Sequence, residues 1–319
     1  MISKIWKQNN FLSYLLLPLS LIYFLSYQIY IFFRQEKKID IPVICVGNVT
    51  LGGAGKTPTV IKIRKLLNDK FENIFVLTRG YKGKKSGPII VNKKSSFLDV
   101  GDESLLHFKY GTTCVAKNKL LGAKFSEEMG CDLLIMDDGL QSINIKKNLK
   151  ILVIDGEFAF GNEKLFPSGP LREPITNCID KCDIIVIIGN RKFLMKSQIF
   201  SHKKVFFASK QISIHKVKNK NLFVFSALGN NKNFHNSLLE KGLKIKRYKE
   251  FPDHHIFKKS EIVKILSEAK DYNLTTVCTE KDYLKVPLKF QKKIIPIPMF
   301  LCIQRTKIFK QEILKKLRN

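Results

Sequence analysis

The chain has 319 residues, of which 45% are hydrophobic, and it carries a formal net charge of +29 at pH 7. This size is enough for a sizeable core and favours two domains over one. The seven cysteines are odd in number and several lie in apolar runs, which argues against a disulfide framework and for reduced thiols in a cytoplasmic compartment. Cys178 and Cys182 form the one close pair, and we expect no metal site there because the sequence offers no second pair or nearby histidines.

The positive charge indicates an anionic partner, which could be nucleic acid, lipid headgroups or a phosphorylated substrate. Lysine far outnumbers arginine, so part of the charge also fits an ordinary solvated surface. The sequence shows no stripe of arginine and aromatic residues, no RNP-like strand and no helix-turn-helix signature. We therefore expect no nucleic-acid partner and favour a membrane surface with anionic lipids.

An uncharged run comes first along the chain. Residues 8–33 carry no charge, and residues 11–33 would extend about 35 Å as a helix, against a hydrocarbon thickness of about 30 Å. Pro18 predicts a kink, and basic residues at both ends leave the orientation open. We predict a membrane-associated helix within residues 1–35, which either crosses the bilayer or lies partly in its interface. A cleaved signal peptide is less favoured because no small-residue cleavage site precedes Arg34.

The next segment reads as a strand, a glycine-rich turn and a helix start, which is the context of a P-loop. Gly52, Gly53 and Gly55 allow the turn to bring its backbone N–H groups close to phosphate oxygens. Lys56 is expected to reach the β and γ phosphates of a nucleotide, and Thr57 to hold Mg²⁺. Thr50 stands where the usual pattern has its first glycine. We expect the nucleotide-binding loop to run from Thr50 through Ala54 to Thr57.

Beyond the loop, short apolar runs alternate with amphipathic stretches. This rhythm predicts an α/β fold with a P-loop NTPase-like, mostly parallel sheet sandwiched by helices, followed by a second, smaller α/β domain. We place the kinase-like core at residues 36–208 and the smaller domain, with a basic terminal helix, at residues 209–319. The expected strands are 41–46, 73–78, 112–116, 132–136, 149–154, 183–188, 204–208, 221–225, 275–278 and 293–296.

Two acidic pairs could carry chemistry. Asp137 and Asp138 end an apolar strand, as expected when a Walker B acid meets the Mg²⁺ held by a P-loop; a helix cap followed by a turn is the alternative. Asp102 and Glu103 lie at a loop-to-helix junction, where Asp102 taken alone is more often an N-cap than a base.

Two adjacent histidines, His254 and His255, follow Asp253. A histidine beside an acid can take part in proton transfer, and a metal-binding or solvent-exposed role is about equally expected from the sequence alone.

Seven strings occur in order over residues 43–283: VGNVTLGGAGKTP, LTRGYKG, VGDES, LLIMDDGLQ, FGNEKLFPSGPLREP, FPDHHIF and TEKDY. Together they resemble the tetraacyldisaccharide 4'-kinases of lipid A synthesis. The resemblance covers most of the chain, and members of that family commonly have Ser or Thr at the position of Thr50.

The resemblance implies an enzyme of the bacterial inner membrane with its catalytic domain in the cytoplasm. It would transfer the γ-phosphoryl group of ATP, with Mg²⁺, to the 4'-hydroxyl of a tetraacylated glucosamine disaccharide 1-phosphate. Asp102 falls on the family's proposed catalytic base and Glu103 lies beside it near the metal. Asp137 and Asp138 match the Walker B pair, with Asp137 taken as a metal ligand and Asp138 as a catalytic residue. His254, favoured over His255, matches a histidine thought to couple with Asp138.

Two positions depart from the family pattern. Ser142 replaces the histidine of the usual DDGLQH string, so any role of that histidine is absent or filled by another residue. A family arginine near the nucleotide corresponds to Lys119, which keeps the charge but loses the bidentate fork. Arg172 remains and reads as structural or substrate-facing.

A membrane-tethered P-loop GTPase or ATPase that acts as a switch is the competing class. Such proteins read guanine through an N-K-x-D motif, and the nearest string, 279–282, lacks the spacing. A basic nucleic-acid ATPase is a third class, and it leaves the apolar N-terminus unexplained.

Overall fold

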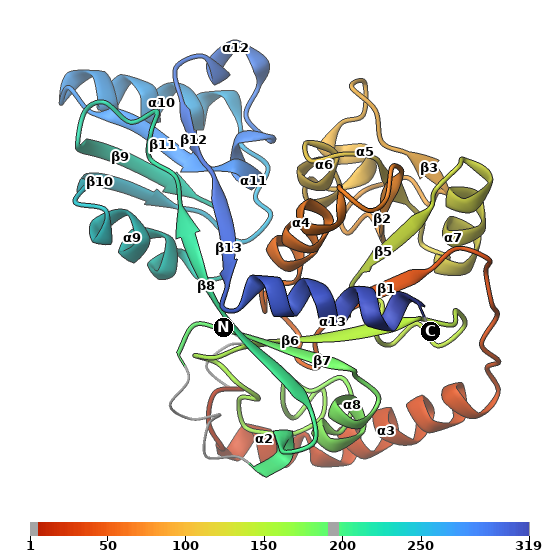
Figure 1. Ribbon diagram of the computed structural model, residues 1–319. Helices are drawn as coiled ribbons and strands as arrows, with labels where there is room; N and C mark the ends of the chain where they lie inside the picture. The colour runs from red at the N-terminus through yellow and green to blue at the C-terminus, as the bar shows by residue number, and fades with distance from the viewer. Residues whose placement is uncertain (1–5, 191–197, 319) are drawn as a thin grey trace.

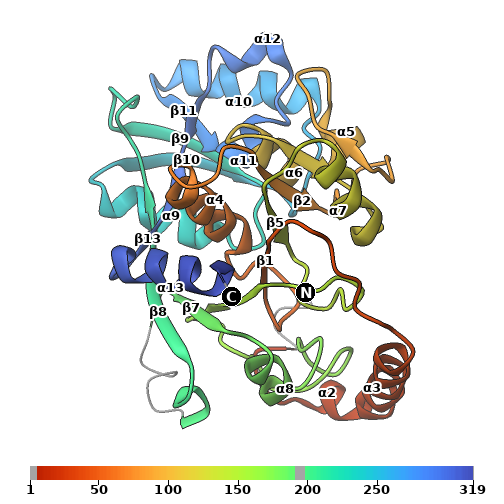
Figure 2. The same cartoon turned by 45° about the vertical axis from the view of Figure 1, so that its right-hand side comes forward.

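The computed structural model describes residues 6–190 and 198–318, which form two sheets with helices packed around them (Figures 1 and 2). Residues 1–5 of the predicted N-terminal segment lie outside this part. The larger sheet of the described chain has nine strands in the order β13-β8-β7-β6-β1-β5-β2-β4-β3. Only the two edge pairs, β13 with β8 and β3 with β4, are antiparallel. The strands are β1 Val43–Gly47, β2 Ile74–Thr78, β3 Ile89–Ile90, β4 Thr113–Val115, β5 Leu133–Asp137, β6 Leu149–Asp155, β7 Ile184–Ile188, β8 Lys204–Ile212 and β13 Met299–Ile303. The expected mostly parallel α/β sheet is thus confirmed.

Helices cover both faces of this sheet, so β1, β2, β5 and β7 are buried at every position and read as continuous apolar runs. On one face pack α4 (Lys56–Leu67) and α13 (Thr306–Arg318). On the other pack α7 (Lys119–Glu128) and α8 (Ile175–Asp180). The short helices α5 (Phe97–Val100) and α6 (Asp102–Phe108) follow β3, and a 3₁₀ turn, Gln198–Phe200, precedes β8.

The smaller sheet lies at one end of the molecule (Figure 1) and has the strand order β10-β9-β11-β12, with all its pairs parallel. Its edge strand β10 is rich in lysine and largely exposed, and charge of this kind protects an edge against pairing with other chains. The elements are β9 Asn221–Ser226, α9 Asn231–Glu240, β10 Lys244–Glu250, α10 Lys259–Asp271, β11 Thr275–Thr279, α11 Glu280–Tyr283, α12 Leu288–Gln291 and β12 Ile295–Ile297.

Two adjacent strands connect the sheets. The chain leaves the larger sheet along β8 and returns along β13, which pairs with it from Met299 opposite Ile212 to Ile303 opposite Ala208. The boundary proposed between residues 208 and 209 falls within β8, and α13 packs Phe309 and Ile313 into the core of the larger sheet. The division into residues 36–208 and 209–319 stays a prediction.

The N-terminal run forms two helices, α2 (Phe11–Leu15) and α3 (Leu17–Phe32), where one continuous helix over residues 11–33 was expected. Pro18 lies in the first turn of α3, where a missing backbone N–H costs no hydrogen bond. The 16 residues of α3 extend about 24 Å, which is short of the hydrocarbon thickness of about 30 Å. Within residues 6–190 and 198–318, no helix combines the length and the apolar character needed to cross a membrane. The structure therefore does not support the spanning alternative for the described residues, and the interfacial alternative stays a prediction.

Candidate active site

The glycine-rich loop lies at the carboxyl end of β1 and leads into α4. Gly52 and Gly55 have φ of 114° and 92°, a region that residues with a side chain rarely adopt. A Cβ on Gly55 would also lie 2.6 Å from Ile188 Cδ1, so the tip of the Ile188 side chain would have to move to admit it. A Cβ on Gly52 or Gly53 would meet no described atom within 4 Å. The loop is therefore open beside the N-terminus of α4, which favours an anion.

Asn48 stabilises this loop through hydrogen bonds of its side chain. Its side-chain amide donates to Thr50 O at 2.6 Å, and its Oδ1 accepts from Lys56 Nζ at 3.0 Å. Thr50 and Ala54 are buried, so they shape the loop from the protein side. The Lys56 ammonium also lies 3.6 Å from Asp138 Oδ2. Lys56, the lysine expected to bind phosphate, thus lies beside Asp138 at the end of β5.

Asp137 ends β5, which is the neighbour of β1 in the sheet. Its Oδ2 accepts from Thr57 Oγ1 at 3.2 Å and lies 2.7 Å from His107 Nε2. Its Oδ1 is buried and has no hydrogen-bond partner among the described residues. Burial favours a higher pKa for Asp137, but the hydrogen bond from His107 and the nearby charges of His107, Lys56 and Lys119 outweigh it and hold the pKa below its usual range. Asp137 is therefore a carboxylate.

This carboxylate and Thr57 fit a magnesium ion. A hydroxyl and a carboxylate with a free buried oxygen are the hard oxygen ligands that Mg²⁺ prefers, and this ion usually takes its remaining ligands from phosphates and water. The described residues contain no group of three or more His, Cys, Asp or Glu side chains that could hold a metal by themselves. The donor set fits an ion held jointly with a nucleotide.

Asp138 forms a bidentate ion pair with Arg172. The sequence alone predicts either a structural or a substrate-facing role for Arg172. The guanidinium donates to both carboxylate oxygens of Asp138, at 2.8 Å and 3.1 Å, and to Gln141 Oε1 at 3.2 Å. Asp138 has a positive φ of 57°, a conformation that non-glycine residues adopt infrequently. The bidentate pair therefore fixes the direction of this carboxylate.

Asp102 begins α6 and is buried, with 4% exposure. His254 Nδ1 lies 3.0 Å and 2.9 Å from its two oxygens, and the ammonium groups of Lys281 and Lys285 each lie 3.8 Å from Oδ2. Burial favours a higher pKa for Asp102, but the His254 hydrogen bond and the charges of Lys281, His254 and Lys285 outweigh it, so the pKa lies below its usual range. Asp102 is an anion surrounded by donors from the smaller sheet.

The two histidines occupy different surroundings. His254 has a φ of 62° and sets its ring edge-on against Tyr81, with 5.2 Å between the centroids. His255 hydrogen-bonds to Glu261 at 2.9 Å and stacks on Phe251. Only His254 of the pair contacts Asp102. The coupling of His254 to Asp138 that the resemblance implies is not seen among the described residues, because Asp138 is bound by Arg172 and Lys56 instead. The choice of His254 over His255 stays a prediction.

Lys119 and Glu103 lie at the margins of this group. Lys119 is buried, and its ammonium donates to the carbonyl oxygens of Leu77 and Asp137, at 3.3 Å and 3.2 Å. Burial lowers the pKa of Lys119 although Asp137 and Asp138 oppose the shift. Glu103 is partly exposed and lies 3.6 Å from Lys281 Nζ. Their contacts with nucleotide and metal stay predictions.

The fold adds residues that the sequence did not single out. His107 lies on the same helix as Asp102, five positions later, and Lys281 and Lys285 come from α11 and the turn after it. The string TEKDY marks the resemblance to the family but predicts no role for its lysine, Lys281. Only the tertiary fold brings these side chains to Asp102 and Asp137.

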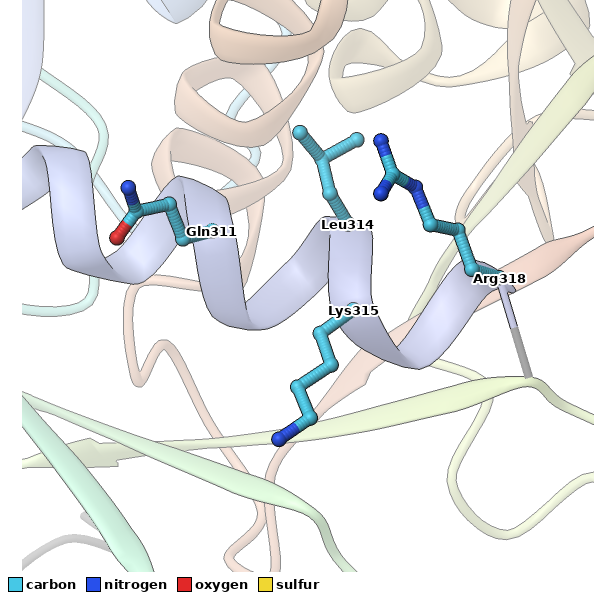
Figure 3. Close-up of a pocket in the computed structure, with 4 residues that line it drawn as sticks. All are labelled: Gln311, Leu314, Lys315 and Arg318. Atoms are coloured by element: carbon cyan, nitrogen blue, oxygen red, sulfur yellow. The ribbon is translucent and has the colours of Figure 1, made fainter.

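A separate surface hollow of about 400 Å³ lies along α13. Figure 3 shows Leu314 and Arg318 directed toward α4 and Lys315 directed the opposite way. Its lining has no carboxylate, hydroxyl or imidazole group, so we assign it no part in the site. The lining residues are Gln311, Leu314, Lys315 and Arg318.

A glycine-rich loop at the carboxyl edge of a parallel sheet, with buried acids on the neighbouring strand, defines an α/β protein of the P-loop type. The family model for Tetraacyldisaccharide-1-P 4'-kinase matches residues 12–318. The chain belongs to this family.

Relatives in sequence and structure agree with this assignment. The Tetraacyldisaccharide 4'-kinase of Rickettsia canadensis is 34% identical over 316 residues, which are 98% of this chain and 96% of that protein. The protein of the same name from Bradyrhizobium diazoefficiens is 36% identical over 253 residues, 77% of this chain and 75% of the relative. A crystal structure of LpxK from Aquifex aeolicus in complex with ATP superposes with a TM-score of 0.79 at 27% identity and covers 96% of this chain and 99% of that chain.

Proposed function

We propose that this protein is an ATP-dependent kinase that phosphorylates the 4'-hydroxyl of a tetraacylated glucosamine disaccharide 1-phosphate, a lipid A precursor. The family match over nearly the whole chain supports the reaction. The solved relative was crystallised with ATP, which supports ATP as the donor. The single structural observation that carries the proposal is that α6 presents Asp102 to His254 and, five residues later, His107 to Asp137 beside the glycine-rich loop.

That spacing sets the reaction geometry. Five residues of helix advance about 7.5 Å, so Asp102 and His107 are separated along α6. We infer that a phosphoryl group held in the loop would lie between Asp102 and a metal at Asp137. Lys56 would leave Asp138 to bind the β and γ phosphates, and Thr57 with Asp137 would hold Mg²⁺. A bound magnesium ion would neutralise charge that develops on the phosphate oxygens.

Asp102 would act as the general base. In the transfer, the 4'-oxygen of the sugar forms a bond to the γ-phosphorus while the bond from that phosphorus to the β-phosphate oxygen breaks, and the hydroxyl proton passes to the Asp102 carboxylate. ADP and the 4'-phosphorylated lipid leave. A pKa below the usual range keeps the Asp102 carboxylate ionised, and His254 with Lys281 would hold it in place.

We propose that α2 and α3 place this site at the cytoplasmic face of the bacterial inner membrane. Large apolar side chains along these helices are exposed, among them Phe11, Leu15, Ile22, Leu25, Ile29 and Phe32. A helix pair with this outward face suits insertion into the membrane interface, and the excess of lysine would add attraction to anionic lipids. A substrate with four acyl chains cannot leave the bilayer cheaply, since each buried methylene contributes about 0.8 kcal/mol.

A transfer assay tests the proposal. Purified protein would be incubated with magnesium and ATP labelled at the γ position, together with the acylated disaccharide 1-phosphate in mixed micelles. We expect label in the lipid, and the same assay with GTP should give far less product. A protein that hydrolyses GTP selectively and leaves the lipid unlabelled would instead be the membrane-tethered switch, which the family match does not favour.

A further inference from the structure

The N-terminal helices carry a buried polar stripe on the side that faces the protein. Ser13 and Ser20 are 0% and 5% exposed, whereas Leu19 and Leu21, the neighbours of Ser20, are 52% and 59% exposed. Tyr23 extends the stripe one turn beyond Ser20. This distribution is the reverse of that in a helix of a soluble protein, where the apolar side faces the core.

The stripe makes specific contacts with one segment, Leu165–Arg172, which we call the bridging segment. Ser20 Oγ donates to Leu165 O at 2.9 Å and accepts from Ser168 N at 3.1 Å. Tyr23 Oη donates to Arg172 O at 2.8 Å, and its ring packs edge-on against Phe166. The helices are thus fixed to the bridging segment by directional bonds as well as by apolar contact.

The bridging segment in turn pairs with the glycine-rich loop. Leu51 N donates to Pro170 O at 2.7 Å, and Arg172 N donates to Val49 O at 2.8 Å. Thr50 and Leu171 form an isolated antiparallel bridge between these two bonds. The guanidinium of the same residue, Arg172, donates to both carboxylate oxygens of Asp138. One residue, Arg172, therefore contacts α3 through its carbonyl, the loop through its N–H and the acidic pair through its side chain.

We propose that α2 and α3 position the nucleotide-binding loop through the bridging segment, with Ser20 and Tyr23 as positioning residues. This inference rests on the proposed function, because it gives the loop a nucleotide to bind. A helix pair that served only to hold the protein at a membrane would need no polar side chains, and hydroxyls in an apolar setting are stable only when they are hydrogen-bonded. The seating of the helices therefore sets the shape of the loop, so nucleotide affinity depends on contacts made at the membrane side of the protein.

Two double variants on the same helix test the inference. Ser20→Ala/Tyr23→Phe removes the two hydroxyls that face the bridging segment. Ser26→Ala/Tyr30→Phe removes the same two groups from the exposed side, where Ser26 bonds to Ile22 O within α3 and Tyr30 is 41% exposed. The pair is matched in chemistry, helix and change in apolar character.

The readout is the dissociation constant of a fluorescent ATP analogue with magnesium, measured in detergent without lipid substrate. Because each lost hydrogen bond of this kind changes an equilibrium by about 2- to 10-fold, we expect Ser20→Ala/Tyr23→Phe to bind about 10-fold more weakly and Ser26→Ala/Tyr30→Phe to stay within about twofold of the unaltered protein. Binding to vesicles of the anionic lipid phosphatidylglycerol should be equal in the two variants. The single variant Tyr23→Phe, which keeps the ring, should fall between them.

The outcomes separate the two proposals. If the unaltered protein does not bind the analogue, the proposed function fails. If it binds and the two double variants match each other, whether unchanged or equally weakened, the positioning role is overturned. Melting temperatures measured alongside guard against unfolding, since a loss of affinity that is present far below the melting temperature belongs to the loop and not to general instability.

Discussion

Asp102 is held as an anion by groups that come from outside its own helix. His254 lies between β10 and α10. Lys281 lies on α11, and Lys285 follows it. Burial by itself would raise the pKa of Asp102. The hydrogen bond from His254 and the charges of Lys281 and Lys285 outweigh this effect and lower the pKa. The segments around the smaller sheet therefore help to keep the pKa of Asp102 low.

Replacement of Asp102 tests the general base. Asp102→Asn should lower kcat by about 10²- to 10⁴-fold, because the amide cannot accept the hydroxyl proton, and should leave the dissociation constant for ATP nearly unchanged. Since the pKa of Asp102 lies below its usual range, the carboxylate should be lost only as pH falls below that range, so this group should cause no decline in rate near neutrality. Asp99→Asn, three residues earlier and without contact to His254 among the described residues, is the matched control. Equal losses in both variants would remove the base assignment.

His107 offers a second test at this scale. Its Nε2 lies 2.7 Å from Asp137, and partners of this kind orient a metal-binding carboxylate. His107→Leu should raise the magnesium concentration needed for half-maximal activity by about 10-fold, whereas His107→Gln, which keeps an N–H donor, should recover most of the loss. Titration of Mn²⁺ binding by electron paramagnetic resonance would check the effect without turnover. Identical behaviour of the two variants would contradict an orienting role.

The sequence located the acids and the loop but not their partners. Gly52 to Thr57 and Asp137 could be found because a strand, a turn and a helix start are local patterns. His107 was not singled out, and Arg172 was named without a settled role, since both roles arise from contacts with residues about 30 positions away. The choice of His254 over His255 came from the family motif and not from any local rule, and the fold pairs His254 with Asp102 and not with Asp138, the acid that the motif implied.

Among elements, the buried strands were predicted well and the exposed ones were missed. Strands covered on both faces read as apolar runs, so β1, β5 and β7 were expected within two residues of their observed bounds. β10 escaped notice because its lysines protect a sheet edge, so its composition resembles a loop. Its existence depends on pairing with β9, which no local pattern encodes.

The terminal helix α13 provides a stability test. Phe309 is fully buried and packs edge-on against Phe206, with 5.0 Å between the ring centroids. Phe309→Ala should lower the free energy of unfolding by about 3–5 kcal/mol through lost burial and a cavity. Ile308→Ala, at the neighbouring position with 47% exposure, should change it by about 0.5 kcal/mol or less. Denaturant titration followed by circular dichroism would measure both, and a similar small effect at the two positions would show that α13 is only loosely attached.

At the scale of the whole molecule, the site is divided between the two sheets. The segments around the larger sheet supply the loop and the acids. The segments around the smaller sheet supply His254, which follows β10, and Lys281 on α11. Glu280 on α11 adds a further link, since it accepts from Tyr110 Oη at 2.9 Å and pairs with Lys109 after α6. We therefore expect phosphoryl transfer to require both parts and nucleotide binding to require mainly the first.

The paired strands β8 and β13 make that division open to experiment. Ile212 lies opposite Met299, and Ser213 N donates to Pro298 O at 3.0 Å, so the points of departure and return are neighbours. Residues 213–298 amount to an insertion at the tip of a β-hairpin, and a two-residue Asn-Gly turn could replace them. We expect the shortened protein to fold and bind ATP but to transfer no phosphate, as nucleotide titration and the labelled-ATP assay would show; failure to fold would mean that the larger sheet needs its insert. The catalytic cycle would then be separable into a binding module and a removable activating one.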